Sequence, residues 1–370
     1  MPAVTADGVP FLDLGEEFAR LEREWFDSLR ETGARGSFIL GPNVQAFEKE
    51  FADYLGVRHA VGLANGTDAL LLCLRALGIG PGDEVVTTPY TFFATTEVIS
   101  LLGATPVFVD IDPHSFNMDP DLISAAVTGK TKAILPVHLF GHPADMDAIN
   151  VIAQAHGVAV IEDCAQACGA QWKGKPAGSF GICAAFSFYP TKVLGCYGDG
   201  GMLTTSDEGV AVQVRRLRNH GATAHFMHDQ IGYNSRLDEI QASLLRIKFR
   251  YLGDVVAARQ RIANAYDKRL RGSRVITPQH AEQSGHAFNL YTVRLPDRDA
   301  ARQRFVEHNI GHSLCYPLPL HLQAVYKDLG YEAGSLPASE QASRECISLP
   351  IYPDMPEEHV DRVCEILLGE

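Results

Sequence analysis

Two segments of the sequence end in side chains that could do acid–base or nucleophilic chemistry. VIEDCAQA (160–167) puts Asp163 at the end of an apolar strand, where a carboxylate could hold a protonated ring nitrogen and keep it cationic. FSFYPTK (186–192) leads to Lys192, with a glycine cluster directly behind it. A lysine in such a place can form a Schiff base when burial and nearby cations lower its pKa. The alternatives are a strand-end Asp that only caps the next turn and a solvated Lys.

A third segment, NGTDAL (65–70), has the residue types of a phosphate-binding turn. Gly66 lies in a turn that leads into a helix, and Thr67 and Asp68 fall at capping positions. Backbone N–H groups, the helix dipole and a Thr hydroxyl at a helix start suit a phosphate. An ordinary capped helix uses the same residue types, so this segment alone leaves both interpretations open.

The three segments taken together indicate one kind of site more specifically than any of them does alone. A phosphate-type turn comes first, followed by the aromatic segment TPYTFFAT (88–95), then Asp163, and then Lys192 with Ser187 shortly before it. This order and spacing match a fold-type I enzyme that uses pyridoxal 5′-phosphate (PLP), a cofactor that acts as an electron sink.

The elements that must position these residues alternate regularly from residue 59 onward. Apolar runs with strand character are separated by helical patterns, which predicts parallel pairing with helices on both faces of the sheet. We therefore expect an α/β protein with a mostly parallel central sheet, whose ligand lies at the C-terminal ends of the strands. The predicted strands lie within 59–64, 81–89, 105–112, 132–139 and 158–164, and the predicted helices within 65–78, 91–103 and 144–157.

Two domains are predicted. Residues 1–255 form a large PLP-binding domain with an N-terminal helical segment. Residues 256–370 form a smaller C-terminal α+β domain, because a strand, a helix and a Pro-punctuated stretch follow Pro278.

Composition excludes several classes of protein. The chain has 370 residues, 46% hydrophobic and 21% charged, so disorder, collagen, coiled coil and a small disulfide scaffold are ruled out as whole-chain descriptions. The net charge of −13 opposes a general nucleic-acid or anionic-membrane surface. No stretch approaches the ~20 apolar residues of a membrane span, and the N-terminus does not resemble a secretory signal. We interpret the eight scattered cysteines as buried thiols, which predicts a cytoplasmic protein, and expect no metal site at these or at His138 and His142.

Nearly end to end, the sequence resembles the sugar-nucleotide aminotransferases of the DegT/StrS type, which aminate keto sugars. The motifs that carry the resemblance are FLDL (11–14), ILGPNVQAFEKEFADYLG (39–56), NGTDAL (65–70), PVFVDID (106–112), PVHLFG (136–141), IEDCAQA (161–167), SFYPTK (187–192), GDGG (198–201), RNHG (218–221), GYNSRLDEIQA (232–242) and SLPIYPDMP (348–356).

The resemblance implies a role for each of four cofactor contacts. Lys192 looks like the lysine that forms the internal aldimine and later moves the migrating proton. Asp163 looks like the partner of the pyridine nitrogen. Gln166 matches the glutamine that hydrogen-bonds the phenolic oxygen of the cofactor, and Phe92 matches the aromatic ring that stacks on its pyridine face.

The resemblance also implies how the phosphate is held. One set of residues lies in the same subunit, and Asn234 matches a segment that reaches the phosphate of the neighbouring subunit's cofactor, with Arg236 as a second candidate. The phosphate contacts expected within the subunit are Gly66, Thr67 and Ser187, with Asp68 in the same turn.

The implied protein is a homodimeric PLP-dependent aminotransferase with its active sites at the subunit interface. An amino donor, usually glutamate in this family, would convert PLP to pyridoxamine phosphate (PMP), and a nucleotide-linked keto sugar would then take the amino group in a ping-pong cycle. Lys192 would be the general base and acid. Tyr316 and His321, in YPLPLH (316–321), are expected to contact the sugar nucleotide, although packing of a Pro-rich stretch would explain them too.

Three other functions are weighed against this one. A transaminase of a free keto sugar or cyclitol would have the same cofactor site. A PLP-binding regulator or sensor without turnover is disfavoured because Asp163, Gln166 and Lys192 are all present. A dinucleotide-dependent oxidoreductase is disfavoured because the glycine fingerprint GxGxxG is absent.

Overall fold

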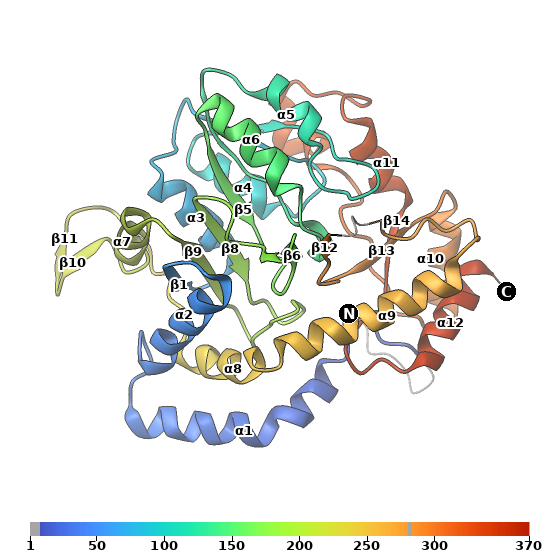
Figure 1. The fold of residues 1–370 in the computed structure, drawn as a ribbon, viewed down its shortest axis with the longest axis horizontal. Helices are drawn as coiled ribbons and strands as arrows, with labels where there is room; N and C mark the ends of the chain where they lie inside the picture. The colour runs from blue at the N-terminus through green and yellow to red at the C-terminus, as the bar shows by residue number, and fades with distance from the viewer. Residues whose placement is uncertain (1–7, 280–282, 370) are drawn as a thin grey trace.

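A seven-stranded sheet forms the centre of the computed structural model, which describes residues 8–279 and 283–369 (Figure 1). The strand order is β1-β9-β8-β5-β4-β2-β3. The strands are β1 (His59–Leu63), β2 (Glu84–Thr87), β3 (Thr105–Phe108), β4 (Thr131–Ile134), β5 (Ala159–Asp163), β8 (Cys183–Ser187) and β9 (Gly201–Thr205).

The sheet is parallel except at one strand. Each neighbouring pair from β8 through β5, β4 and β2 to β3 is parallel, whereas β9 is antiparallel to both β8 and β1. The predicted α/β fold with a mostly parallel central sheet is therefore confirmed. The C-terminal ends of β1, β2, β4, β5 and β8 meet at one edge, which is where a ligand binds in an open α/β sheet.

Helices cover both faces of the sheet because the strands alternate their side chains between two cores. In β8, Ala184 and Phe186 join the core under α2 and α8, whereas Cys183 and Ala185 join the core under α3 and α7. The helices of this part are α1 (Leu14–Arg35), α2 (Pro42–Leu55), α3 (Gly66–Ala76), α4 (Ala94–Leu101), α5 (Pro120–Ala126), α6 (Met146–His156), α7 (Glu208–Leu217) and α8 (Glu239–Phe249).

A separate core forms around the antiparallel pair β13 (Tyr291–Arg294) and β14 (Cys346–Leu349). The N-terminal segment joins this core, because Val9 is buried in it and bridges to Ile310. The helices around it are α9 (Leu252–Leu270), α10 (Arg298–Glu307) and α12 (Glu357–Leu368), whereas α11 (Pro337–Glu345) packs through Ala342 in a smaller core with Tyr90 and Phe116. The predicted domain boundary between residues 255 and 256 falls inside α9, and this division of the chain stays a prediction.

Several shorter elements surround the two cores. The hairpin of β10 (Ala222–Ala224) and β11 (Met227–His228) projects away from the sheet, beyond α7 (Figure 1). No helix within residues 8–279 and 283–369 is long and apolar enough to cross a membrane. The remaining elements are β6 (Gln171–Trp172), β7 (Lys175–Pro176), β12 (Ser284–Gly285) and the 3₁₀ helices η1 (Leu139–Gly141), η2 (Leu320–Leu322) and η3 (Ala324–Leu329).

The apolar core between β8 and α2 should contribute strongly to the free energy of unfolding. Phe51 is fully buried, and its ring lies 5.0 Å from that of Phe186 and 5.7 Å from that of Phe188. We expect Phe51→Ala to lower the free energy of unfolding by about 3–5 kcal/mol, because it removes apolar contacts and leaves a cavity. Thermal unfolding followed by circular dichroism checks this. Val151→Ala, on the exposed side of α6, is the control, and equal melting temperatures for the two variants would contradict the prediction.

Candidate active site

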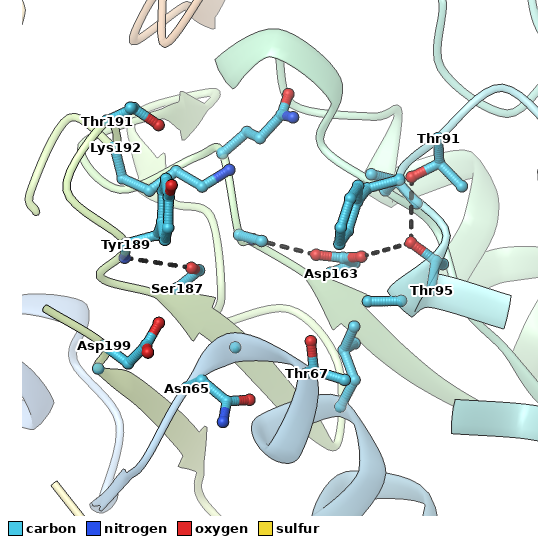
Figure 2. Close-up of a pocket in the computed structure, with 18 of the residues that line it drawn as sticks. Asn65, Thr67, Thr91, Thr95, Asp163, Ser187, Tyr189, Thr191, Lys192 and Asp199 are labelled. Atoms are coloured by element: carbon cyan, nitrogen blue, oxygen red, sulfur yellow. Dashed lines mark hydrogen bonds between the residues drawn. The ribbon is translucent and has the colours of Figure 1, made fainter. Parts of the chain in front are cut away.

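A cavity of about 510 Å³ opens at the C-terminal ends of the parallel strands. It brings together most of the predicted site residues, although they are far apart in the sequence. Those that line it are Gly66, Thr67, Phe92, Asp163, Gln166, Ser187, Lys192 and Tyr316. Figure 2 shows that Thr67, Asp163 and Lys192 come from separate segments of the chain and face one common space.

The floor of the cavity is the turn between β1 and α3. The Asn65 side chain caps α3 by accepting a hydrogen bond from the Asp68 N–H at 2.8 Å. The N–H groups of Gly66 and Thr67 belong to the first turn, where a helix offers no backbone acceptor. Gly66 is required here, because a Cβ at this position would lie 2.7 Å from Cβ of Ser187. The turn is therefore shaped to bring N–H donors and the Ser187 hydroxyl close to one anion.

Asp163 is buried at the end of β5, with 4% of its surface exposed. Its Oδ1 accepts a hydrogen bond from the Ala165 N–H at 3.1 Å, and its Oδ2 accepts one from Thr95 Oγ1 at 2.9 Å. Burial raises the pKa of the Asp163 carboxyl, while these two hydrogen bonds and the Lys192 ammonium oppose the rise. A cationic partner in the cavity would stabilise its ionised form further.

Sequence reasoning missed the two threonines that support Asp163. Thr91 Oγ1 lies 3.0 Å from Thr95 Oγ1 (Figure 2). Thr95 has one hydroxyl proton and gives it to Asp163, so Thr91 must donate to Thr95. The two threonines are four residues apart in the sequence, with Thr91 in the loop before α4 and Thr95 in the first turn of that helix.

Lys192 extends into the cavity from the loop that follows β8 (Figure 2). Backbone hydrogen bonds hold this loop, from the Lys192 N–H to the Tyr189 carbonyl at 2.9 Å and from the Phe188 N–H to the Gly200 carbonyl at 2.8 Å. Burial lowers the pKa of the Lys192 amine, an effect that the Asp163 carboxylate partly offsets. A lowered pKa increases the fraction of neutral amine, which is the form that can act as a nucleophile or base.

Gln166 and Tyr316 form a second polar pair in the cavity. Gln166 Nε2 donates to Tyr316 Oη at 2.9 Å, and Gln166 Oε1 accepts from the Phe140 N–H at 2.7 Å. Both ends of the amide are therefore held. The cavity also contains Asp199, Tyr189 and Thr191, which sequence reasoning did not single out.

Four predicted residues do not line this cavity. The Asp68 N–H is capped by Asn65, and His321 is buried elsewhere, with its Nε2 3.3 Å from Glu340 Oε1. Asn234 is exposed and bridges to Asn219, to whose Oδ1 the Arg236 side chain also donates at 2.8 Å. Their predicted roles in binding stay predictions.

A cluster of His138, Glu162 and Cys164 has ligand atoms within 4.8 Å of one another, yet the first two are engaged. Glu162 accepts hydrogen bonds from three backbone N–H groups of residues 178–181 and faces His138 Nε2 at 3.0 Å. His138 Nδ1 accepts a hydrogen bond from the Ala144 N–H at 3.0 Å. The ring proton is therefore on Nε2, which donates a hydrogen bond to Glu162. Hydrogen bonding explains this pair without a metal.

The sequence is similar to known proteins along nearly its whole length. Residues 20–368 match the DegT/DnrJ/EryC1/StrS aminotransferase family. A pleiotropic regulatory protein of Geobacillus stearothermophilus is 48% identical over 96% of this chain and 97% of its own length. UDP-N-acetyl-3-dehydro-alpha-D-glucosamine 3-aminotransferase of Acidithiobacillus ferrooxidans is 44% identical over 97% of each chain.

Solved structures agree with the fold and with the predicted cofactor. The crystal structure of DesV from S. venezuelae in complex with a ketimine intermediate has a TM-score of 0.96, with 41% identity over 98% of each chain. The PLP form of the sugar aminotransferase Spr1654 from Streptococcus pneumoniae, whose assignment is putative in its own description, has a TM-score of 0.87, with 28% identity over 93% of this chain and 95% of that one. The family predicted from the motifs is thereby confirmed, and this chain belongs to the DegT/DnrJ/EryC1/StrS aminotransferase family.

Proposed function

We propose that this protein is a PLP-dependent aminotransferase that moves an amino group from an amino acid, glutamate in the first instance, to a nucleotide-linked keto sugar. The observation that carries the proposal is that Lys192 and Asp163 share one cavity whose floor is a helix start with N–H groups that suit an anion. The relative from Acidithiobacillus ferrooxidans is named for amination of a UDP-linked sugar, which supports the nucleotide-linked class of acceptor.

The residues of the cavity fit PLP. Gly66, Thr67 and Ser187 would hold its phosphate, and Asp163 would hold its ring nitrogen. The Phe92 ring is 62% exposed at the cavity wall and would be covered by the ring of the cofactor. Gln166 would face the phenolic oxygen. When bound, PLP supplies an electron sink for the negative charge that develops when a proton leaves the neighbouring carbon.

Two side chains of the cavity, Asp163 and Lys192, can hold or move protons. An ionised Asp163 carboxylate would keep a proton on the ring nitrogen of the cofactor, and Thr95 favours the ionised form by donating to Oδ2. The Lys192 amine, whose pKa is lowered by burial, would serve as the base and acid that moves the proton. Glutamate and the keto sugar would react in turn at the same position, which gives the ping-pong order.

We also propose that the working unit is a homodimer. Among the described residues that line the cavity, Lys192 is the one Lys or Arg, and Asp163 and Asp199 are opposite to it in charge. A phosphate dianion at the Gly66 turn would therefore lack cationic partners within one subunit. Asn234 and Arg236 lie outside the cavity, beside the projecting hairpin, and a second copy could place them at the phosphate.

A regulator is the second candidate, because the relative from Geobacillus stearothermophilus is named as a regulatory protein. The presence of Lys192, Asp163 and Gln166 in one cavity favours turnover over binding alone. Conversion of bound PLP to PMP by glutamate separates the two candidates. A substrate panel with and without the nucleotide separates a nucleotide-linked acceptor from a free keto sugar or cyclitol.

Replacement of the lysine tests the cofactor assignment. We expect PLP-loaded wild-type protein to show a visible absorption band that changes with glutamate, and Lys192→Ala to lose or alter that band. Lys175→Ala, on an exposed side chain of β7, should behave as wild type. Identical spectra for Lys192→Ala and wild type would contradict the assignment.

Replacement of Thr95 tests the support of Asp163. Thr95→Val removes the donor to Oδ2 and keeps the shape of the side chain. We expect the rate of the glutamate half-reaction to fall about tenfold, in line with the loss of a hydrogen bond to a charged group. The acidic limb of the pH–rate profile should move to higher pH, because the lost hydrogen bond opposes the raised pKa of Asp163.

Stopped-flow absorbance with a matched variant checks this effect. Thr96→Val is the control, since Thr96 is also fully buried on α4 but donates to the Phe93 carbonyl instead. Equal rates and equal pH profiles for the two variants would show that Thr95 has no special role.

Mixed dimers test the contribution of the second subunit. A variant with both Asn234→Ala and Arg236→Ala should be weakly active, and mixing it with Lys192→Ala should restore about a quarter of the wild-type sites, because half the dimers are hybrids with one intact site each. Mixing Lys192→Ala with Asp163→Ala is the control, since both residues belong to one subunit's cavity and no intact site can form. No restoration in the first mixture would contradict a role in the neighbouring site.

A further inference from the structure

Both ends of the Gln166 amide are held by residues in an uncommon backbone conformation. Oε1 accepts a hydrogen bond from the Phe140 N–H at 2.7 Å, and Nε2 donates one to Tyr316 Oη at 2.9 Å. Phe140 has a φ of 59° and Tyr316 a φ of 56°, in the left-handed region that residues other than glycine rarely adopt. Residues held in such conformations cluster at functional sites, so we asked what these two hydrogen bonds achieve.

The two hydrogen bonds fix which end of the amide is which. The Phe140 N–H can only donate, so the atom bonded to it is the amide oxygen and the atom that meets Tyr316 is the nitrogen. Nε2 carries two protons, and the Tyr316 oxygen accepts one of them. The other makes no hydrogen bond to the residues that the structure describes, and Gln166 lines the active-site cavity. One N–H donor is therefore left for an acceptor inside the cavity.

The turn that carries the Phe140 N–H is fixed by contacts with a distant segment. The Phe140 carbonyl accepts from the Leu290 N–H at 3.2 Å, and the Gly141 carbonyl accepts from the Ala287 N–H at 2.9 Å. Gly141 is needed here because it has a φ of 94° and a Cβ at this position would lie 3.0 Å from the Gln166 carbonyl oxygen. The donor to Oε1 is thus set by the fold.

Aromatic packing fixes the Tyr316 side chain in the same way. Its ring is nearly parallel to that of Phe140, with centroids 6.3 Å apart and 12° between the planes. The ring of Tyr90, which is fully buried, meets it edge-on at 5.5 Å. These contacts hold the Tyr316 hydroxyl at Gln166.

The Tyr316 hydroxyl is a hydrogen-bond acceptor that does not titrate near neutral pH. Burial raises the pKa of the phenol, Cys315 and Asp163 act in the same direction, and the hydrogen bond from Gln166 opposes the rise only in part. A change in a pH profile after replacement of Tyr316 would therefore report an effect on another group, and not the loss of its own titration.

We propose that Tyr316 is a positioning residue that, with the Phe140 N–H, holds the Gln166 amide so that its free N–H faces the phenolic oxygen of PLP. This rests on the proposed aminotransferase function and on the predicted contact of Gln166 with that oxygen. An N–H aimed at the oxygen stabilises its negative charge, whereas the amide carbonyl would repel it. The role is separate from the predicted contact of Tyr316 with the sugar nucleotide, because it operates before any sugar binds.

A pH titration of the visible absorption band tests the proposal on the PLP-loaded full chain, without glutamate or sugar. At low pH the phenolic oxygen shares a proton with the nitrogen that joins PLP to Lys192, and at high pH this proton has left. A donor to the oxygen favours the high-pH form, so its loss raises the midpoint of the titration. We expect Gln166→Met to raise the midpoint by about one pH unit and Tyr316→Phe by about half a unit to one unit.

A double variant shows whether Tyr316 acts through Gln166. Tyr316→Phe combined with Gln166→Met should have the midpoint of Gln166→Met alone, because the group that Tyr316 positions is already absent. Two shifts that simply add, or an unshifted midpoint in Tyr316→Phe, would overturn the proposal. The titratable neighbours Asp163 and Cys315 are unchanged in every variant.

Tyr90→Phe is the matched control. It also removes a buried phenolic hydroxyl from the same aromatic cluster, but one that makes no hydrogen bond to Gln166. Its midpoint should equal that of the wild type. A shift as large as that of Tyr316→Phe would mean that packing, and not the hydrogen bond, sets the midpoint. Melting temperatures of the cofactor-free proteins confirm that each variant is folded.

The same spectra separate this inference from the proposed function. A band that titrates as expected but does not change with glutamate would mean that the aminotransferase function fails while the role of Tyr316 stands. A wild-type protein that shows no visible band with PLP would overturn both.

Discussion

The geometry of the site depends on one buried carboxylate, Asp163, that shares a cavity with the Lys192 amine. Burial of a charge is unfavourable unless hydrogen bonds or an opposite charge replace the lost water. The main chain of Asp163 is fixed first, by hydrogen bonds to the Pro136 carbonyl at 2.9 Å and from the His138 N–H at 3.0 Å. The parallel sheet therefore places the backbone, and the loops that follow β2 and β8 bring Thr95 and Lys192 to the side chain.

The last two residues of β5, Glu162 and Asp163, point to opposite faces of the sheet and have different partners. Because successive side chains of a strand point to opposite faces, Glu162 and Asp163 cannot enter the same space. Glu162 holds the loop at 178–181 and the His138 side chain, and is fully buried. Asp163 faces the cavity. The first carboxylate of this short acidic motif thus holds the surroundings of the sheet edge, and the second faces the cavity.

Sequence patterns predicted the parts of this account that depend on local order. The strand-end Asp163, the capped turn at Gly66 and the lysine after an aromatic run are each visible within a few residues, and strand–helix alternation predicts that they meet at one edge. Thr95 was not predicted. Its hydrogen bond joins distant segments, since Thr95 meets Asp163 from the first turn of α4. His321 lies outside the cavity, with its Nε2 3.3 Å from Glu340 Oε1, and its contact with the sugar nucleotide stays a prediction.

The most direct test of the central claim is to trap the bound cofactor on the protein. PLP-loaded protein would be reduced with borohydride, digested and analysed by mass spectrometry for the lysine that carries the label. The account predicts a single labelled peptide that contains Lys192, with labelling suppressed when glutamate is added before reduction. A label on a different lysine, or no label on protein that has bound PLP, would contradict the assignment of Lys192 and of the cavity that surrounds it.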